Sequence, residues 1–530
     1  EGLESSLVIK RLQSLGFCTS PVKVPFTIQD GTEDNYLWRP YQSLSLLSER
    51  WGALFSGVPV SPLWWGLYNW ARNDAAYRPR LEDVSRGIRD NNDVPIIAPE
   101  LVNGLFLKRG YMSGSVTRLE KYRQCPFKFY AQYGLQLEPR KVRSFGAPEI
   151  GTFLHANLER LGTQLLSEHK QWRDLDETAQ QELCARVAAD ILEENRYDED
   201  EKTAYDKAIE ERVVRTLQKT VSRLVDWSSR SSFDTMYLEQ DFGRPNGWES
   251  IKVPLGDDRY LRLVGQIDRI DEYKRDGHTY GMVIDYKSGS TSVNAQEIYY
   301  GLKLQLMTYL LALESAYKKH HDQPMTPAAV VYTYVKNPRT PAGEPVSYEE
   351  AKALADTNGA LNNKGYFTDD IDMLEKMDEQ LLTYKGKGPY VPVRITGKGT
   401  IHSGDMKVVK SSGDFDIMCR YTESIMADTG SAIGKGEFPI APYQLNKAIP
   451  CSYCDYKTVC RFDNERNQYN YLTSLNEANA LEKMHEALNG TSKNVASGVT
   501  SEHMVSSAAK LLGESVNKDS SMTGGDDNGR

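Results

Sequence analysis

The sequence lacks any hydrophobic run long enough to span a membrane, although 40% of its 530 residues are hydrophobic. A spanning helix needs about 20 predominantly apolar residues. The most apolar stretch, residues 94–107, is broken by proline, asparagine, glycine and glutamate. The N-terminus has neither an initiator methionine nor the basic-then-apolar pattern of a secretory signal. We therefore expect a cytoplasmic protein without a membrane anchor, cut from a longer polypeptide.

Excess positive charge and nucleotide-binding loops are also missing. The formal net charge is −9 and the sequence pI is about 5.6, so composition does not indicate nucleic-acid binding, although a local basic groove is what contacts phosphate. The sequence contains no G-x4-G-K-[ST] motif, which excludes a phosphate-cradling P-loop in this chain. Seven cysteines are few for a chain of this length, and its hydrophobic content supplies a large core, so no disulfide scaffold is needed.

Composition and hydrophobic periodicity divide the chain into three parts. Residues 1–112 are helical and aromatic-rich, and their tryptophans predict a packed core, with base-stacking platforms as the alternative. Residues 113–470 combine helices with strands, which predicts an α/β domain. Residues 471–530 form an extension that we expect to be disordered from about residue 488, because small and polar residues dominate it. The periodicity predicts helices at about 115–135, 151–166, 175–195, 203–227, 294–317, 347–355, 370–383 and 414–434, strands at about 236–242, 251–255, 260–273, 280–287 and 328–335, and a loop rich in glycine and lysine at 385–404.

One predicted hairpin is the most informative feature of the sequence. Two strand-like runs flank the Asp-Gly dipeptide at 276–277, a strong signal for a two-residue turn. A turn of that length pairs Arg275 with His278. Further along the same ladder it places Asp268 opposite Asp285 on one face. Opposed carboxylates repel each other unless something neutralises them, and hard oxygen ligands of this kind favour Mg²⁺ or Mn²⁺.

Further polar side chains are expected close to this pair. Lys287 lies two residues beyond Asp285 and projects from the same face, where its ammonium can orient the attacking water of a phosphodiester hydrolysis and offset developing negative charge. Gln305 and Tyr309 share a face of the following helix, and His155 is a candidate third metal ligand. The alternatives are a solvated surface hairpin, an exposed glutamine with a half-buried tyrosine, and a histidine that binds no metal.

Three of the cysteines are clustered near the end of the α/β part. Cys451, Cys454 and Cys460 form C-x2-C-x5-C, a metal-binding spacing that still needs a fourth soft ligand. Cys125, which has proline and aromatic neighbours, is the best candidate. A metal held by all four would join the two ends of the domain. Four thiolates hold Zn²⁺ or an iron–sulfur cluster, and the spacing does not decide between them. Three unligated thiols are the remaining alternative.

Six segments between Ser113 and Asp463 carry a resemblance to a known family. They read SVTRLEKYRQCPFKFYAQYGLQL, EIGTFLHANLERL, LVGQIDRID, MVIDYKSGS, LKLQLMTYLLAL and CSYCDYKTVCRFD. In this order they are similar to the AddB chains of Gram-positive helicase/deoxyribonucleases of the AddAB type. The nuclease domain of that family belongs to the RecB-like branch of the PD-(D/E)XK superfamily. The resemblance covers roughly two-thirds of the chain.

The resemblance implies a fold, a reaction and a set of site residues. The fold would be a PD-(D/E)XK core, a central mixed sheet flanked by helices and stapled by an iron–sulfur cluster, with residues 1–112 as the remnant of a helicase-like region. The implied reaction is Mg²⁺-dependent hydrolysis of single-stranded DNA, on the 5′-ended strand, at duplex ends. It would take place in a heterodimer with an AddA-type helicase/nuclease chain that processes double-strand breaks for recombination. The implied site residues are His155, Asp268 and Asp285 for the metal, Lys287 as the catalytic lysine, Gln305 and Tyr309 as a Q-x3-Y pair, and Cys125, Cys451, Cys454 and Cys460 for one structural [4Fe–4S] cluster.

Two rival functions come from different classes. A non-catalytic DNA-binding or scaffolding protein would not need the complete metal site that the sequence contains. A stand-alone iron–sulfur exonuclease would not need the helicase-like remnant. Local basic density also predicts a DNA path, with a solvated helix face as the alternative. Its residues would be Arg118, Lys121, Arg123 and Lys128.

Overall fold

The computed structural model describes most of the chain between residues 7 and 490. The residues within this span that it does not describe are 18–36, 38, 56–57, 90–91, 93, 109, 139–146, 195–203, 257, 290, 321–324, 336–345, 348–349, 351–362, 385 and 465. The helix predicted at 347–355 falls mostly among these, and the tail predicted to be disordered lies almost wholly beyond the described part. The chain divides into two compact units, residues 1–93 and 94–530.

The first unit is helical. Its helices are α1 (Leu7–Ser14), α2 (Pro40–Phe55), α3 (Pro62–Asn73) and α4 (Arg78–Arg89). Helices α2, α3 and α4 pack against one another around Trp51 and Trp64, which confirms the predicted tryptophan core for these two residues. Trp65 and Trp70 are exposed instead.

The second unit begins before the predicted domain start at residue 113. Helix α5 (Pro99–Phe106) packs on α15 (Ser412–Gly434), and the Ile97 amide donates to the Gly436 carbonyl at 3.0 Å. The elements that follow are β1 (Leu107–Lys108), β2 (Tyr111–Gly114), α6 (Val116–Gln124), α7 (Pro126–Phe129) and a π-helical turn (Tyr130–Gly134). The helix predicted at 115–135 is interrupted at Cys125 as expected, because Pro126 starts a new helix at a position that needs no amide donor.

A six-stranded sheet forms the centre of the second unit. Its order is β10-β9-β8-β7-β6-β3, and its strands are β3 (Asp234–Phe242), β6 (Gly265–Arg275), β7 (His278–Lys287), β8 (Met325–Tyr334), β9 (Lys364–Thr368) and β10 (Val409–Lys410). The pairs β7–β8 and β9–β10 are parallel and the others antiparallel. This confirms the predicted α/β class with a central mixed sheet.

The single strand predicted at 260–273 is wrong. It consists of β5 (Arg259–Leu263) and β6, which belong to different sheets. Val264 separates them, and its amide donates to the Gly114 carbonyl at 3.0 Å, where β2 ends. Strand β5 lies between β2 and β4 (Ile251–Gly256) in a small second sheet, so the chain changes sheets just before the predicted site.

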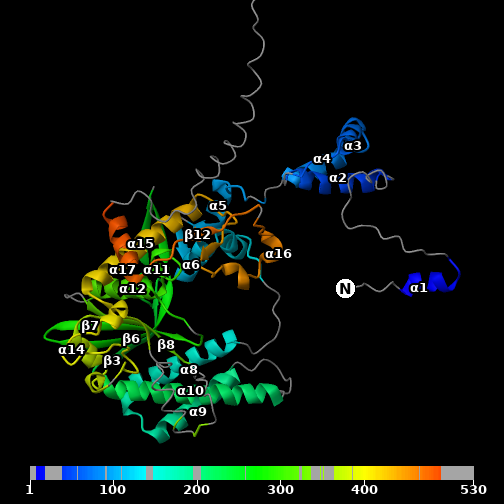
Figure 1. Ribbon diagram of the computed structural model, residues 1–530. Coiled ribbons are helices and arrows are strands. Elements are labelled where there is room, and N and C mark those ends of the chain that lie inside the picture. Colours follow the sequence, from blue (N-terminus) through cyan, green and yellow to red (C-terminus); the bar gives the residue numbers. More distant parts are fainter. Residues whose placement is uncertain are drawn as a thin grey trace, which may run out of the picture. The chain divides into compact units, whose positions relative to one another are not determined.

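Helices cover both faces of the central sheet (Figure 1). On one face lie α8 (Ala147–Ser167), α9 (Glu177–Glu194) and α10 (Ala204–Arg230), close to the predicted spans. On the other face lie α12 (Gln305–His320) and α15. Alternating residues of β7 divide between these layers, because Met282 and Ile284 face the first and Val283 faces the second.

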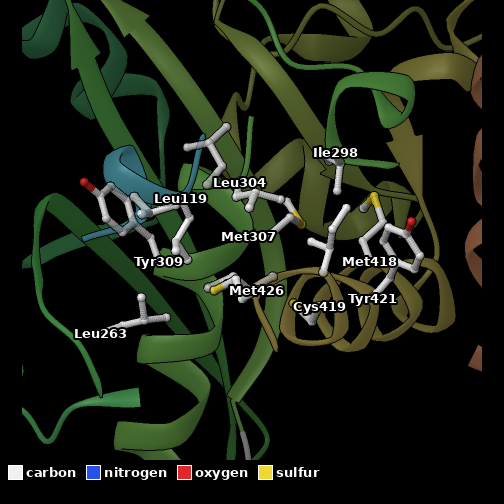
Figure 2. Close-up of a cluster of buried hydrophobic side chains, with 14 of the residues drawn as sticks. Leu119, Leu263, Ile298, Leu304, Met307, Tyr309, Met418, Cys419, Tyr421 and Met426 are labelled. Atoms are coloured by element: carbon white, nitrogen blue, oxygen red, sulfur yellow. The ribbon is translucent and has the colours of Figure 1, made fainter. Parts of the chain in front are cut away.

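The layer of α12 and α15 is closely packed. Figure 2 shows Met307 of α12 near Met418 and Met426 of α15. The helix predicted at 294–317 is broken, because α11 (Ala295–Tyr299) is followed by Gly301, which has a φ of +73° that favours glycine. The remaining elements are α14 (Ile371–Met377), β11 (Tyr443–Leu445), α16 (Lys457–Cys460), β12 (Asn470–Leu472) and α17 (Glu477–Leu488), with 3₁₀ turns at Trp172–Asp174, Leu381–Thr383, Ser403–Val408 and Pro450–Tyr453. In the described part of the chain, no helix is long and apolar enough to cross a membrane.

Candidate functional site

The predicted hairpin exists, with the predicted register. Asp276 and Gly277 both have positive φ, +51° and +79°, as a two-residue hairpin turn requires. Arg275 pairs with His278, and the ladder continues in that register along β6 and β7.

The two strands separate where the aspartates begin. The β6–β7 ladder ends at Arg269–Ile284, one position before Asp268 and Asp285, so the predicted pairing of the two aspartates across the ladder is wrong. From there β6 continues only beside β3, and β7 only beside β8. The Asp268 carboxylate occupies the gap, where its Oδ2 accepts a hydrogen bond from the Tyr286 amide at 2.7 Å. The sheet therefore opens at this end and holds two carboxylates at the opening.

Both aspartates are buried, with exposed fractions of 8% for Asp268 and 1% for Asp285. Burial raises the pKa of Asp285 to about 7, and the nearby negative charge of Asp268 adds to this shift. Lys287, which pairs with Oδ2 of Asp285, opposes it. Burial likewise raises the pKa of Asp268 to about 6, against the effect of His155. Asp285 Oδ1 has no hydrogen-bond partner among the described residues. Such a buried acceptor indicates a place for a cation.

His155 reaches this gap from α8. Its Nε2 lies 3.0 Å from the Tyr286 carbonyl, to which Nε2–H can donate, so that Nδ1 faces the carboxylates. Nδ1 is 3.5 Å from Asp268 Oδ2 and 3.8 Å from an oxygen of Glu239. Burial alone would lower the pKa of His155, but the carboxylates of Glu239 and Asp268 raise it above its ordinary value.

Glu239 is a site residue that the sequence analysis missed. It lies on β3 between Leu238, which pairs with Arg269, and Gln240, which pairs with Ile267, so it stands opposite Asp268. Its φ is +44°, a strained value for a residue other than glycine and one that recurs at functional sites.

The ligand atoms of His155, Glu239 and Asp268 all lie within 4.8 Å of one another. The sequence analysis instead named Asp285 as the third member of this set. In the structure Asp285 lies beside the group, paired with Lys287. Lys287 projects from the same face as Asp285, as predicted, and its ammonium lies 5.4 Å from the centre of the Tyr332 ring.

A cavity of about 500 Å³ opens beside this group. His155, Glu239 and Asp268 line it together with Tyr309. The side-chain Nε2 of Gln305 donates to the Tyr309 hydroxyl at 2.8 Å, which confirms that these two residues share a face of α12. The other lining residues are Ser115, Val116, Thr117, Gly151, Thr152, Arg244, Val264, Gly265 and Gln266.

Glu120 of α6 is the second residue that the sequence analysis missed. Its Oε1 accepts hydrogen bonds from the amides of Leu304 and Gln305, at 2.7 and 3.1 Å. These amides begin α12 and have no acceptor within the helix. Burial raises the pKa of Glu120 to about 7, although the two amides and Lys287 oppose the shift. Glu120 therefore fixes the end of the helix that carries Gln305 and Tyr309.

The four predicted cluster cysteines come together. Cys125 between α6 and α7, Cys451 and Cys454 around the 3₁₀ turn, and Cys460 of α16 line one cavity of about 210 Å³. Burial, together with Cys451 and Cys454, raises the pKa of Cys125 to about 12. Among the described cysteines, no three sulfur atoms lie within 4.8 Å of one another. Tetrahedral Zn²⁺ with ligands at about 2.3 Å would bring its four sulfurs to about 3.8 Å.

The four basic residues of the predicted DNA path do not form one surface. The Arg118 guanidinium stacks 4.6 Å above the Tyr133 ring, and Lys121 donates to the Tyr133 hydroxyl at 3.2 Å. Arg123 points inward and donates to the Tyr300 carbonyl at 3.1 Å. Lys128 lines the cysteine cavity instead. Of the four, Arg118 and Lys121 lie together on the outer side of α6.

The sequence profile of the PD-(D/E)XK nuclease superfamily matches residues 113–461. This match covers more than half of the chain and contains the opened hairpin and all four cysteines. The chain therefore belongs to the PD-(D/E)XK nuclease superfamily.

Further similarities narrow this class. The profile of the fifth domain of the ATP-dependent helicase/deoxyribonuclease AddB matches residues 31–87. A curated ATP-dependent helicase/deoxyribonuclease of the AddB type from Clostridioides difficile strain 630 is 32% identical over 79% of this chain and 36% of its own length. The corresponding proteins from Caldanaerobacter subterraneus and Desulforudis audaxviator are 30% and 31% identical, over 90% and 89% of this chain and 40% of each relative. The resemblance to AddB-type proteins is confirmed, and the chain spans about two fifths of the length of these relatives.

Proposed function

We propose that this chain is the nuclease part of a helicase–nuclease complex and hydrolyses single-stranded DNA, most readily the 5′-ended strand, with Mg²⁺ or Mn²⁺. The observation that carries the proposal is the opened end of the β6–β7 hairpin. There, three carboxylates and a histidine surround a gap that contains a buried oxygen without a partner.

The donor set fits a hard divalent cation. Carboxylate oxygens with one imidazole are ligands of Mg²⁺ and Mn²⁺, and His155, Glu239 and Asp268 would hold the ion, with Asp285 beside them. The chemistry supplied by such an ion is activation of water and stabilisation of the charge that develops on the phosphate.

The residues of the chain itself have separable roles in this reaction. Asp268 fixes the opened strand end through the Tyr286 amide. Lys287 neutralises Asp285 and has 29% of its side chain exposed, so its ammonium can contact a phosphate oxygen in the transition state. Tyr309, oriented by Gln305, lines one wall of the cavity.

Cleavage of end-labelled single-stranded DNA tests the proposal. We expect Mg²⁺-dependent cleavage by the parent chain, alone or with its helicase partner, and none by Asp285→Ala. Asp190→Ala, on the exposed side of helix α9, is the matched control and keeps the parent rate. Equal activity of Asp285→Ala and the parent, with the partner present, would leave DNA binding or scaffolding as the function.

We also propose that the four cysteines hold one [4Fe–4S] cluster. The four cysteines line one cavity and supply the four thiolates that such a cluster needs. The cluster would join α6 to the segment around α16 and stabilise the fold. Iron and sulfide analysis of anaerobically purified protein tests this, and zinc without iron would contradict it.

The relatives are named as components of an ATP-dependent helicase/deoxyribonuclease. For this chain we propose an AddA-type helicase/nuclease as the partner, duplex ends as the entry point and recombinational repair of double-strand breaks in the cytoplasm as the process. Co-purification with an AddA-type chain tests the heterodimer. A fully active chain that binds no such partner would instead fit a stand-alone exonuclease.

A further inference from the structure

The catalytic end of the sheet continues into a group of basic side chains that the proposed reaction does not use. We call this group the basic edge; it consists of Lys364 on β9 and Lys387, Arg394 and Lys407 on the segment between the 3₁₀ turn at Leu381–Thr383 and β10. We infer that the basic edge binds the phosphate backbone of the DNA strand on the side of the active site remote from the His155 cavity. This inference rests on the proposed nuclease function and adds a substrate surface to it.

The strand register places the basic edge close to the active site. Asp285 of β7 pairs with Tyr332 of β8, and Tyr332 pairs with Lys364 of β9. Directly paired residues share a face, so Lys364 lies two strands from Asp285 on the same side of the sheet. Two strand spacings are about 10 Å, which corresponds to about three phosphates of a stacked strand at a rise of about 3.4 Å.

The basic edge has more positive charge than its own acidic groups neutralise. Asp405 is fully buried and accepts from both Lys387 and Arg394, each at 2.8 Å. Lys364 and Lys407 have no acidic partner within ion-pair distance among the residues that the structure describes. Burial, followed by the charges of Lys387 and Lys407, lowers the pKa of Lys364, as expected for cations held near one another.

The segment that carries most of the basic edge is positively charged, although the whole chain is acidic. Residues 385–410 contain six lysines and arginines and one acidic residue, whereas the whole chain has a net charge of −9. Like charges held together cost stability unless a ligand of opposite charge offsets them. An anionic ligand is therefore the occupant that fits this arrangement.

DNA is favoured as that ligand because of the electrostatics of the site next to it. Glu239, Asp268 and Asp285 form an acidic centre that repels a polyanion before a metal ion binds. Positive charge on both sides of that centre would hold a strand across it. Arg244, which pairs with the carboxylate of Asp241 at 2.7 Å, lines the cavity on the side of β3, and the basic edge lies on the side of β9. A strand that crosses the carboxylates would contact both.

Salt-dependent DNA binding tests the inference. The variant is Lys364→Gln/Lys387→Gln/Lys407→Gln, which keeps Arg394 to hold Asp405. Binding of a fluorescein-labelled single-stranded oligothymidylate is followed by anisotropy in Ca²⁺ over a range of salt concentrations. We expect the Kd to rise about tenfold or more and the slope of log Kd against log salt to fall by about 2, because each lost phosphate contact removes about 0.7.

A charge-matched control separates local from general effects. Lys274→Gln/Lys318→Gln/Lys319→Gln removes three exposed lysines at the far end of the sheet, where Tyr317 of α12 bonds Glu272 near the hairpin turn. This control should bind DNA as the parent does, and thermal unfolding should be similar for all three proteins. With Mg²⁺, the basic-edge variant should cleave saturating DNA with the parent kcat. Its KM, measured over a range of DNA concentrations, should be raised.

Three outcomes would overturn the inference. They are an unchanged salt slope in the basic-edge variant, an equal loss in the control variant, and normal DNA binding with loss of binding to the AddA-type partner, which would make the basic edge a protein interface. The proposed nuclease function fails separately, if the parent and Asp285→Ala cleave DNA equally.

Discussion

Strand β6 carries buried charges on both of its faces, and the two faces differ in how these charges are neutralised. On the face toward α8, α9 and α10, Arg269 donates to both oxygens of Asp271, at 2.7 and 2.6 Å. The guanidinium lies between the rings of Trp172 and Trp227, at 6.0 and 5.5 Å. The Tyr286 hydroxyl completes the group at 3.5 Å. This face is neutral and hydrogen-bonded within the chain.

On the other face, Asp268 lies one residue from Arg269 along the chain but pairs with no guanidinium among the described residues. Its neighbours Glu239 and Asp285 are also acidic, and His155 and Lys287 are the charged groups that oppose them among the described residues. Two buried groups of similar depth therefore have opposite arrangements. The paired group belongs to the framework of the fold, whereas the acidic group has the electrostatics of a site that is completed by a cation.

The largest expected effect comes from a substitution in the acidic face of β6, the face that carries Asp268. Asp268→Asn keeps an acceptor for the Tyr286 amide but removes the charge, so Mg²⁺-dependent cleavage should fall by about 10³-fold or more, because a metal ligand is lost. The same variant should be more stable than the parent in the metal-free state at pH 8, by on the order of 1–3 kcal/mol, because an uncompensated buried charge disappears. Rates of DNA cleavage and urea unfolding in chelator measure the two effects.

The pH dependence of that stability difference is its control. The pKa of Asp268 is raised in the folded protein to about 6, so the carboxyl stabilises the fold fully below about pH 4 and loses this contribution as the pH rises through 6. The advantage of Asp268→Asn should therefore be large at pH 8, about half as large at pH 5 and small at pH 4. A variant that is less stable than the parent at pH 8 would show that the acidic face needs no cation.

The next largest effect comes from a substitution in the paired face of β6, the face that carries the Arg269–Asp271 ion pair. Arg269→Met leaves Asp271 as a buried charge without a partner, so the free energy of unfolding should fall by about 3–5 kcal/mol. Cleavage per folded molecule should stay within about twofold of the parent. The double variant Arg269→Met/Asp271→Leu should recover most of the lost stability, since a well-packed apolar pair replaces the ion pair. A loss of cleavage in a still folded Arg269→Met protein would mean that the two faces are not independent.

The sequence predicted the local parts of this comparison and missed the parts that depend on distant strands. The Asp276-Gly277 turn predicted the register of β6 and β7, and the alternation of side chains along a strand predicted the shared face of Asp285 and Lys287. Glu239 was missed because β3 precedes β6 by two strands that belong to another sheet, so no local spacing reveals their pairing. An acidic residue within the predicted strand at 236–242 was the available signal.

Two predicted elements failed for a related reason. The alternation of β5 continues into β6 through Val264, so one strand was predicted where the chain changes sheets. The helical period of 294–317 continues across the break after α11, and Gly301 is the residue that marks it. In contrast, Cys125 was grouped with the distant cysteines from its residue type and its proline and aromatic neighbours, and in the structure all four line one cavity.

The smallest expected effect concerns Glu120, which connects the helix before Cys125 to the acidic face. Glu120→Ala removes the acceptor for the first amides of α12, so Gln305 and Tyr309 lose their fixed position. We expect kcat to fall about tenfold with KM little changed, and the free energy of unfolding to fall by about 1 kcal/mol, as for a lost helix cap. Glu120→Gln keeps a carbonyl oxygen at the same place and should restore most of both. The two variants differ in whether residue 120 offers an acceptor to the amides of α12. Equal kcat values for Glu120→Ala and Glu120→Gln would therefore show that Glu120 supports the fold and does not position the site.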